Sequence, residues 1–146
     1  MGWRNRKQTL ILNIYIMEII WRRASVISED LITEAENKFC IKLPNDIKAV
    51  FLVANNGRPS VCTFDSPSEK EHVLKKLLSF KKEDVENIYK AKTVVDNDDT
   101  SLFPLANDPS GNLICLKNNK IVYWHHETGT AEFLANSFTD FLNSLY

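Results

Sequence analysis

Apolar residues recur every three or four positions in the early part of the chain, which is the spacing of one face of an α-helix. Leu31, Ala35 and Phe39 form such a row within residues 27–44. Ser28 precedes them and is a residue type favoured at helix N-caps. We therefore expect a helix in this segment, with Ser28 as its N-cap.

A second apolar row follows the pair Leu43-Pro44. Proline is favoured at the first position of a helix because its missing N–H would have no partner there, so we expect Pro44 at that position. The sequence Asn55-Asn56-Gly57 then predicts a helix end at which Gly57 adopts a left-handed conformation. The residues expected to face the core are Ile47, Val50, Phe51 and Ala54.

After these helices, β-branched and aromatic residues become frequent, which is typical of strands. Residues 60–64 predict a short strand, and residues 82–91 predict a short helix. Residues 71–80 fit either a helix or a strand. The clearest unit is residues 112–124, in which two alternating apolar runs flank Asn118-Asn119 and predict a β-hairpin.

The chain ends with a further strand and a helix. Residues 131–135 are apolar except for one glutamate and predict a strand. Ser137 and Asp140 form an acidic variant of the capping box, which satisfies N–H groups at a helix start. Helices first, strands in the middle and a helix last indicate an α+β domain. The last helix is expected to face inward with Phe138, Phe141, Leu142 and Leu145.

Charge is distributed unevenly along the chain, although the formal net charge is -1. Residues 1–26 carry five basic side chains and one acidic side chain, whereas residues 27–146 carry 13 basic and 18 acidic side chains. An acidic body is unsuited to binding nucleic acid, whose phosphates require a basic surface. We therefore expect no direct contact with nucleic acid.

Residues 1–26 are interpreted as an N-terminal helix or extension, and residues 27–146 as a single domain. The apolar run near the N-terminus follows a basic stretch, as in a signal peptide, but it contains Asn13 and Glu18 and no small-residue cleavage site follows it. The run is also too short to span a bilayer. We therefore expect a cytoplasmic protein without a membrane contact. The expected helix would place Leu10, Ile14, Met17 and Trp21 on one face.

Three cysteines, Cys40, Cys62 and Cys115, are an odd number at wide spacing, which fits neither a disulfide framework nor a zinc motif. Such usage favours a reducing compartment. Cys115 lies in an apolar run in which no neighbour would stabilise a thiolate. The pattern therefore does not predict a cysteine-dependent hydrolase.

The sequence His125-His126-Glu127 is the most conspicuous candidate for chemistry. Adjacent side chains on a strand point to opposite faces, so the two histidines are not expected to bind one ion. His125 and Glu127 can share a face, but a catalytic zinc usually has three protein ligands. We expect no metal and no cofactor, and a metal-dependent hydrolase built on His125 and Glu127 is kept as an alternative.

Residues 108–112 read Asp-Pro-Ser-Gly-Asn, which could hold a cation or a phosphate. A calcium loop needs a longer acidic series, and phosphate loops place their glycines and lysine differently. The segment instead predicts a tight turn, in which Asp108 accepts hydrogen bonds from nearby N–H groups and Gly111 takes a positive φ.

The chain contains, in this order, the stretches ITEAENKFCIKLPNDIKAVFLVANNG, FPLANDPSGNLICL, IVYWHHE and LANSFTDFL. Together they resemble the SUKH superfamily, which is named in part after a fungal regulator of cell-wall glucan synthesis and has many bacterial members that are immunity proteins of toxin systems. The likeness covers about residues 27–145 and rests on several ordered motifs. The matching positions are Glu36, Leu43, Pro44, Asn56, Gly57, Pro104, Asp108, Gly111, Asn112, Trp124, His126, Glu127, Ser137, Phe138 and Phe141.

The resemblance implies a mixed, mainly antiparallel central sheet flanked by helices, and it favours a strand or an extended conformation within residues 71–80. It also implies a binding function without catalysis. Immunity members neutralise a cognate toxin, often a nuclease or a nucleic-acid deaminase, by docking on it, and the family has no known shared catalytic residues. A regulatory interaction module of the glucan-synthesis kind is the alternative.

A toxin that acts on nucleic acid must present a basic cleft, so its inhibitor gains speed and specificity from an acidic surface. Aromatic residues are favoured at the centre of such interfaces. Of the neighbours Tyr123 and Trp124 only one is expected to face inward, and the resemblance favours the tryptophan. We expect a protein partner, and a monomer or weak homodimer. The predicted partner-binding residues are Asp65, Asp96, Asp98, Asp99, Tyr89, Tyr123, His125 and Glu127.

Overall fold

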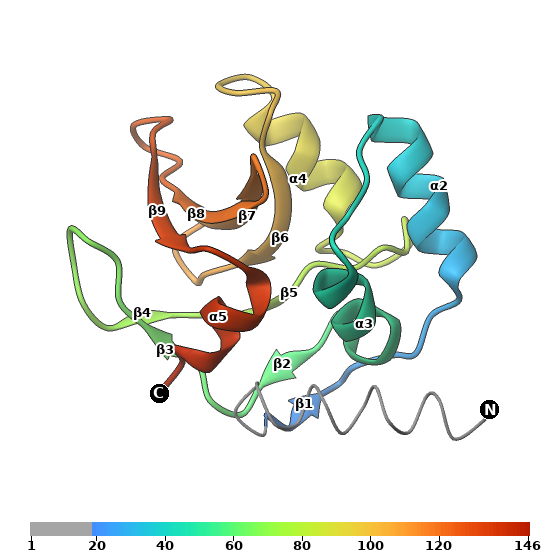
Figure 1. Ribbon diagram of the computed structural model, residues 1–146, viewed down its shortest axis with the longest axis horizontal. Coiled ribbons are helices and arrows are strands. Elements are labelled where there is room, and N and C mark those ends of the chain that lie inside the picture. Colours follow the sequence, from blue (N-terminus) through green and yellow to red (C-terminus); the bar gives the residue numbers. More distant parts are fainter. Residues whose placement is uncertain (1–18) are drawn as a thin grey trace.

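A computed structural model describes residues 19–146, and its main element is a five-stranded sheet (Figure 1). The strand order is β5-β6-β7-β8-β9, so neighbours in the sheet are also neighbours in the chain. Each of these strands is antiparallel to the next. The strands are β5 (Lys76–Leu77), β6 (Phe103–Asn107), β7 (Leu113–Lys117), β8 (Lys120–Trp124) and β9 (Ala131–Ala135).

Two small sheets and four helices complete the part of the chain that the structure describes. In the small sheets, β1 (Trp21–Arg22) pairs with β2 (Arg58–Pro59), and β3 (Thr63–Phe64) pairs with β4 (His72–Val73), both antiparallel. The predicted α+β class is therefore confirmed. Within residues 19–146 the one parallel pairing is the isolated bridge between Ser79 and Asn87. The helices are α2 (Glu29–Phe39), α3 (Asn45–Ala54), α4 (Ile88–Val95) and α5 (Phe138–Asn143).

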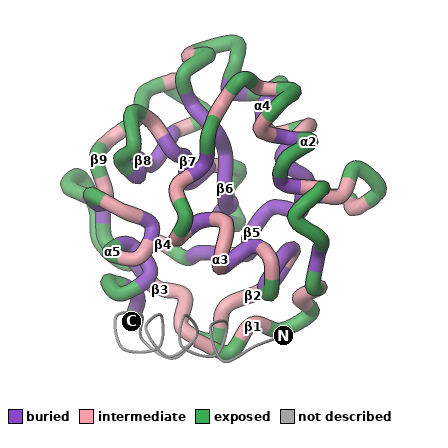
Figure 2. Tube along the Cα trace, turned by 45° about the vertical axis from the view of Figure 1, so that its right-hand side comes forward, coloured by how far each residue is buried: buried purple, intermediate pink, exposed green. Residues whose placement is uncertain are grey.

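Both faces of the central sheet are covered, and burial is greatest along β6, β7 and β8 (Figure 2). Tyr123 packs against Phe64, and Phe64 packs against Phe141 of α5, with ring centroids 5.2 and 5.4 Å apart. The Trp124 indole nitrogen instead contacts Asp98, just after α4. The expectation that only one of Tyr123 and Trp124 faces inward is wrong, because both are buried, Tyr123 against Phe64 and Trp124 against Asp98.

The β7–β8 hairpin forms as predicted. Asn118 and Asn119 have φ angles of 51° and 62°, which is the left-handed pair that a two-residue hairpin turn requires. The strand at residues 131–135 is also confirmed, and the extended alternative for residues 71–80 is correct because β4 and β5 lie within them.

The helices differ from the predictions mainly at their starts. Pro44 is the N-cap of α3 and not its first residue. Ser28 occupies the N-cap of α2, but its side chain makes no capping hydrogen bond. The helix expected at residues 82–91 begins only at Ile88, where Asn87 caps it by accepting a hydrogen bond of 2.9 Å from the Lys90 N–H. By contrast, Ser137 caps α5 as predicted, at 3.0 Å from the Asp140 N–H.

The predicted N-terminal helix lies largely outside the described residues, since Leu10, Ile14 and Met17 belong to residues 1–18. Its last predicted member, Trp21, is in strand β1, so a helix that reaches this residue is wrong. Among the described helices, none has the length and apolar character needed to cross a bilayer.

The end of α3 shows why a glycine is required at position 57. Asn56, not Gly57, adopts the left-handed conformation, with a φ of 65°, which corrects the prediction for Gly57. A Cβ atom on Gly57 would lie 2.8 Å from the Ala54 carbonyl oxygen and 3.1 Å from the Ala24 Cβ. Gly57 is therefore needed for close packing and not for its backbone freedom.

We predict that Gly57→Ala lowers the free energy of unfolding by about 2 kcal/mol, because backbone must move to admit the methyl group. Asn56→Gly is the matched control and should change stability by less than about 0.5 kcal/mol, since glycine adopts a positive φ readily. Denaturant unfolding followed by circular dichroism measures both. Equal effects of the two substitutions would contradict the packing role.

Candidate functional site

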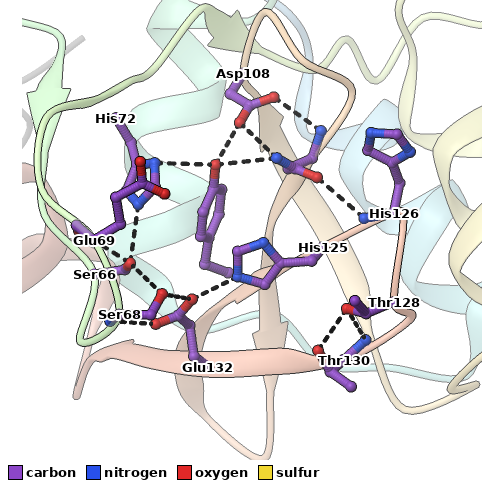
Figure 3. Close-up of polar contacts among 12 residues, drawn as sticks. Ser66, Ser68, Glu69, His72, Asp108, His125, His126, Thr128, Thr130 and Glu132 are labelled. Atoms are coloured by element: carbon purple, nitrogen blue, oxygen red, sulfur yellow. Dashed lines mark hydrogen bonds and ion pairs between the residues drawn. The ribbon is translucent and has the colours of Figure 1, made fainter.

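Three connections meet beside the central sheet and form the site drawn in Figure 3. They are the β3–β4 loop at residues 65–71, the β6–β7 turn at 108–112 and the β8–β9 turn at 125–130. The middle one is the predicted tight turn. Asp108 Oδ1 accepts hydrogen bonds of 2.8 Å from the N–H groups of Ser110 and Asn112, and Gly111 has a φ of 92°.

The Asp108 carboxylate is also the acceptor for the buried end of Tyr123. Asp108 is 6% exposed, and its Oδ2 accepts a short hydrogen bond from the Tyr123 hydroxyl. The Asn112 amide donates to the same carboxylate oxygen at 3.1 Å and to the Tyr123 oxygen at 3.3 Å. Burial raises the pKa of Tyr123 well above its ordinary value, and the hydrogen bond to Asp108 raises it further. The hydroxyl therefore stays protonated and fixes the turn to the sheet.

His72 connects this turn to the β3–β4 loop. Its ring packs on Tyr123 with centroids 4.7 Å apart, and its Nδ1 lies 3.5 Å from the Tyr123 hydroxyl oxygen. Its Nε2 lies 2.9 Å from the Ser66 Oγ. One imidazole thus spans from the sheet to the start of the loop.

Glu132 of β9 fastens the same loop from the other side. Its carboxylate accepts hydrogen bonds from the Ser68 N–H at 3.0 Å and the Ser68 hydroxyl at 2.8 Å, and it pairs with His125 Nε2. Burial would raise the pKa of Glu132, but the hydrogen bonds from His125 and Ser68 outweigh it and hold the pKa below its ordinary value. Glu132 therefore remains charged and keeps residues 65–71 on the sheet.

These connections enclose two adjoining hollows of about 530 and 310 Å³, which share Ser110, Asn112 and His125. We call them together the acidic cavity. Among the residues that the structure describes, no lysine or arginine lines it. Of its carboxylates, Asp108 and Glu132 are bonded as described above, whereas those of Glu69, Glu71 and Glu127 are exposed and have no hydrogen-bond or ion-pair partner among residues 19–146. The lining carboxylates are Glu69, Glu71, Asp108, Glu127 and Glu132.

The predicted acidic loop lies elsewhere, after α4, and its charges are largely compensated. Asp96 pairs with Lys92, and Asp99 Oδ2 lies 2.6 Å from Lys117 Nζ. The hydrogen bonds from Lys117 and Ser101 lower the pKa of Asp99 to about 2. These two carboxylates therefore present less free charge to a partner than their sequence suggests.

Asp98 has a structural contact that the sequence did not indicate. Its Oδ2 accepts a hydrogen bond of 3.2 Å from the Trp124 indole N–H. A Cβ atom on Gly129 would lie 2.8 Å from the Asp98 carboxylate carbon, and Gly129 has a φ of 72°. Asp98 therefore packs directly under the β8–β9 turn and helps to set the position of one wall of the acidic cavity.

The remaining predicted partner-binding residues lie in different parts of the structure. His125 and Glu127 line the acidic cavity. Asp65 lies in the same loop as Glu69 and Glu71, where it accepts hydrogen bonds from the Glu71 N–H and the Tyr146 hydroxyl. Tyr123 also lines the acidic cavity, but it is 1% exposed and therefore offers little surface to a partner.

Tyr89 lies apart from the acidic cavity. Its ring is 5.5 Å from that of Phe39, and the Lys82 ammonium lies 4.9 Å above it. Its hydroxyl oxygen is buried and has no hydrogen-bond partner among the described residues. The structure therefore does not bring Tyr89 together with the other predicted contacts.

The two histidines diverge, although they lie in a turn and not on a strand (Figure 3). His125 points to Glu132, whereas His126 is exposed and its ring lies beside Gly111. Within residues 19–146 no group of three histidine, cysteine, aspartate or glutamate side chains is arranged to hold a metal ion. Burial also raises the pKa of the Cys115 thiol far above its ordinary value, so it is not an activated nucleophile.

Several site residues were missed from the sequence because they become neighbours only through the fold. The path of the β3–β4 loop brings these residues to the site. Ser68 donates a hydrogen bond to Glu132, Ser66 bonds to His72, and Glu69 lines the acidic cavity. One signal was available, since Glu132 is the single charged residue in the apolar strand at 131–135. A charge in such a place needs a partner.

Comparisons with known proteins identify the family and the fold. A family model described as "SMI1-KNR4 cell-wall", one of the SUKH families, matches residues 29–142. The chain is similar to a crystal structure of a protein from Pseudomonas syringae pv. tomato, with a TM-score of 0.51 and 12% sequence identity over 83% of each chain. At this identity the likeness supports the fold alone. No sequence among the curated proteins gives a significant match.

We predict that Tyr123→Phe lowers the free energy of unfolding by about 1.5 kcal/mol at neutral pH, because buried Asp108 loses a donor. The raised pKa of Tyr123 means that its contribution is present below the ordinary tyrosine value of 10.0 and is lost as the pH rises above it. The difference between wild type and variant should therefore shrink above about pH 10 in denaturant unfolding.

Tyr89→Phe is the control, because the hydroxyl that it removes is buried without a hydrogen-bond partner among the described residues. Its effect on stability should be close to zero or slightly stabilising. A Tyr123→Phe variant as stable as Tyr89→Phe at neutral pH would show that the Asp108 contact contributes nothing.

Proposed function

The chain belongs to the SUKH family described as "SMI1-KNR4 cell-wall", and from this premise we propose that it is a non-enzymatic immunity protein that neutralises a protein toxin by occluding it. The toxin would be of the nuclease or nucleic-acid deaminase type, as for many bacterial members of the superfamily. The protein would act in the cytoplasm, where such toxins meet nucleic acid.

The acidic cavity is the observation that carries this proposal. Its rim bears the exposed carboxylates of Glu69, Glu71 and Glu127, and no lysine or arginine of residues 19–146 lines it. An enzyme that binds nucleic acid needs basic side chains at its active site. Complementary charge accelerates association and selects the correct partner. The acidic cavity would therefore receive basic side chains of the toxin.

The hydrogen-bonded walls of the acidic cavity favour tight binding. Glu132 and His72 hold the β3–β4 loop, and Asp108 holds the neighbouring turn. A surface that is rigid before binding loses little conformational entropy when the complex forms. Stoichiometric occlusion needs only this rigid, complementary surface. It would require neither a bound cofactor nor a catalytic residue.

His125 and Glu127 belong to this surface, and Asp65 supports the loop that carries Glu69 and Glu71. The acidic loop with Asp96, Asp98 and Asp99 would contribute a weaker, separate charge, because Lys92 and Lys117 already neutralise part of it.

A regulatory role in cell-wall synthesis is the second candidate, and the description of the matching family as "SMI1-KNR4 cell-wall" supports it. The same acidic cavity would then bind a basic segment of a host protein. The neighbouring gene distinguishes the two functions, because an adjacent toxin gene is expected for immunity and is not expected for regulation.

We predict that co-expression of this protein protects cells from the toxin encoded beside it, and that the purified pair binds one to one. The triple variant Glu69→Gln, Glu71→Gln and Glu127→Gln should weaken binding at least about tenfold, because interfacial charge pairs are lost. Calorimetry or surface plasmon resonance at low and high salt measures this loss, which should be smaller at high salt.

The matched control removes three exposed acids far from the acidic cavity, by Glu29→Gln, Asp30→Asn and Glu83→Gln. This control should bind as the wild type does. Equal weakening by both triple variants would show that only net charge matters. If the protein neither binds the adjacent toxin nor protects cells from it, the immunity function itself is refuted.

A further inference from the structure

The outer edge of β9 is the one edge of the central sheet that no described residue pairs with. At the opposite edge, the Leu77 N–H of β5 donates to the Gly57 carbonyl at 2.9 Å, so that edge is covered. Within residues 19–146, the main chain of 131–135 forms hydrogen bonds with β8 and with no other segment. In the described part of the chain no further strand lies beyond β9 (Figure 1).

The backbone of Phe133 points towards this open edge. Beyond the strand ends, the His125 N–H donates to the Thr130 carbonyl at 2.8 Å. Residue pairs of an antiparallel ladder alternate between bonded and non-bonded. Tyr123–Glu132 is therefore a bonded pair and Val122–Phe133 a non-bonded one, given the observed register. The backbone N–H and C=O of Phe133 consequently face away from β8, where they could form hydrogen bonds with the backbone of another strand.

The side chains of β9 do not protect this edge. Proteins usually block an open edge with lysine, proline, an inward-pointing charge or a β-bulge. The strand has neither lysine nor proline, and its single charge, Glu132, is held by Ser68 and His125. Its register shift lies beyond Phe133, at Leu134, and leaves residues 131–133 in regular pairing with β8. Phe133 is 50% exposed, and its neighbour Ala131 is exposed. The strand is mostly intermediate or exposed in Figure 2. An unprotected apolar edge of this kind favours pairing with a strand of another molecule.

The sequence of β9 is compatible with itself in the antiparallel direction. It reads Ala-Glu-Phe-Leu-Ala. With a twofold axis at Phe133, Phe133 pairs with Phe133 and Glu132 lies opposite Leu134, where the register shift of β9 ends the regular ladder. No two carboxylates face each other, and an aromatic pair lies at the centre, which is a favourable cross-strand combination.

We propose that two copies of this chain associate through β9, antiparallel and centred on Phe133, so that the two central sheets join into one. Few strand residues take part, so the dimer is weak and dissociates on dilution. This proposal does not rest on the immunity function, because its partner is the chain itself.

The full-length protein should show a concentration-dependent monomer–dimer equilibrium in sedimentation equilibrium. Phe133→Lys should raise the dissociation constant at least about tenfold, because it places a lysine on the edge, as proteins with protected edges do. Val85→Lys is the matched control, since Val85 is 83% exposed and lies outside the sheet, and it should leave the equilibrium unchanged. Phe133→Ser serves as a second variant if circular dichroism shows that Phe133→Lys is not folded.

A cross-link tests the position of the axis. Residues paired across an antiparallel ladder have Cα atoms about 5.5 Å apart when bonded, which is within the range of a disulfide. In a background with Cys40→Ser, Phe133→Cys should form an intermolecular disulfide on mild oxidation, and Val85→Cys should not.

Three results would overturn the proposal. They are a monomer at every concentration, a dimer that Phe133→Lys and Phe133→Ser leave intact, and the absence of the Phe133→Cys disulfide in a protein that does dimerise.

Discussion

The structure depends on the simultaneous burial of Tyr123 and Trp124, two neighbours on β8 whose polar atoms both need acceptors. A buried hydroxyl or indole N–H without a hydrogen bond is costly. The Tyr123 hydroxyl donates to Asp108 and the Trp124 indole N–H donates to Asp98, on opposite faces of the sheet. Each acceptor lies in a connection between elements, so satisfying the two side chains fixes the β6–β7 turn and the loop after α4.

The charge of the candidate surface follows from this arrangement. Asp98 and Asp108 serve the sheet, and Glu132 holds the β3–β4 loop, so these carboxylates have local partners. The acids left without partners among the described residues include Glu69, Glu71 and Glu127, which gather at the acidic cavity. Structural and binding carboxylates are thus adjacent in space but differ in hydrogen bonding. The hydrogen-bonded carboxylates hold the loops in place, and the exposed ones remain available to pair with a partner's basic side chains.

Much of the candidate site could not be predicted, because a hydrogen bond between distant segments leaves little trace in local sequence. The turn at residues 108–112 was predictable, since aspartate and glycine at that spacing have a local conformational effect. The negative charge that the loop at 96–99 offers to a partner was overestimated. Its partners Lys92 and Lys117 lie on α4 and β7, and the sequence does not show these ion pairs. Ser68 and Glu132 are 64 positions apart, and only the path of the β3–β4 loop brings them together.

By itself the sequence determined the α+β class, the Asn118-Asn119 hairpin, the inward faces of α3 and α5 and the family motifs, because periodicity and turn chemistry act within a few residues. In α2 the buried residues are Ile32 and Ala35, so the predicted row with Leu31 and Phe39 was only partly correct. The tertiary structure decided that both Tyr123 and Trp124 are buried, that Gly57 is needed for packing, and that the free carboxylates converge. These outcomes depend on which layer covers each face of the sheet and on close approaches between distant segments. Neither the covering layers nor the approaches between distant segments can be read from the spacing of residues along one strand or helix.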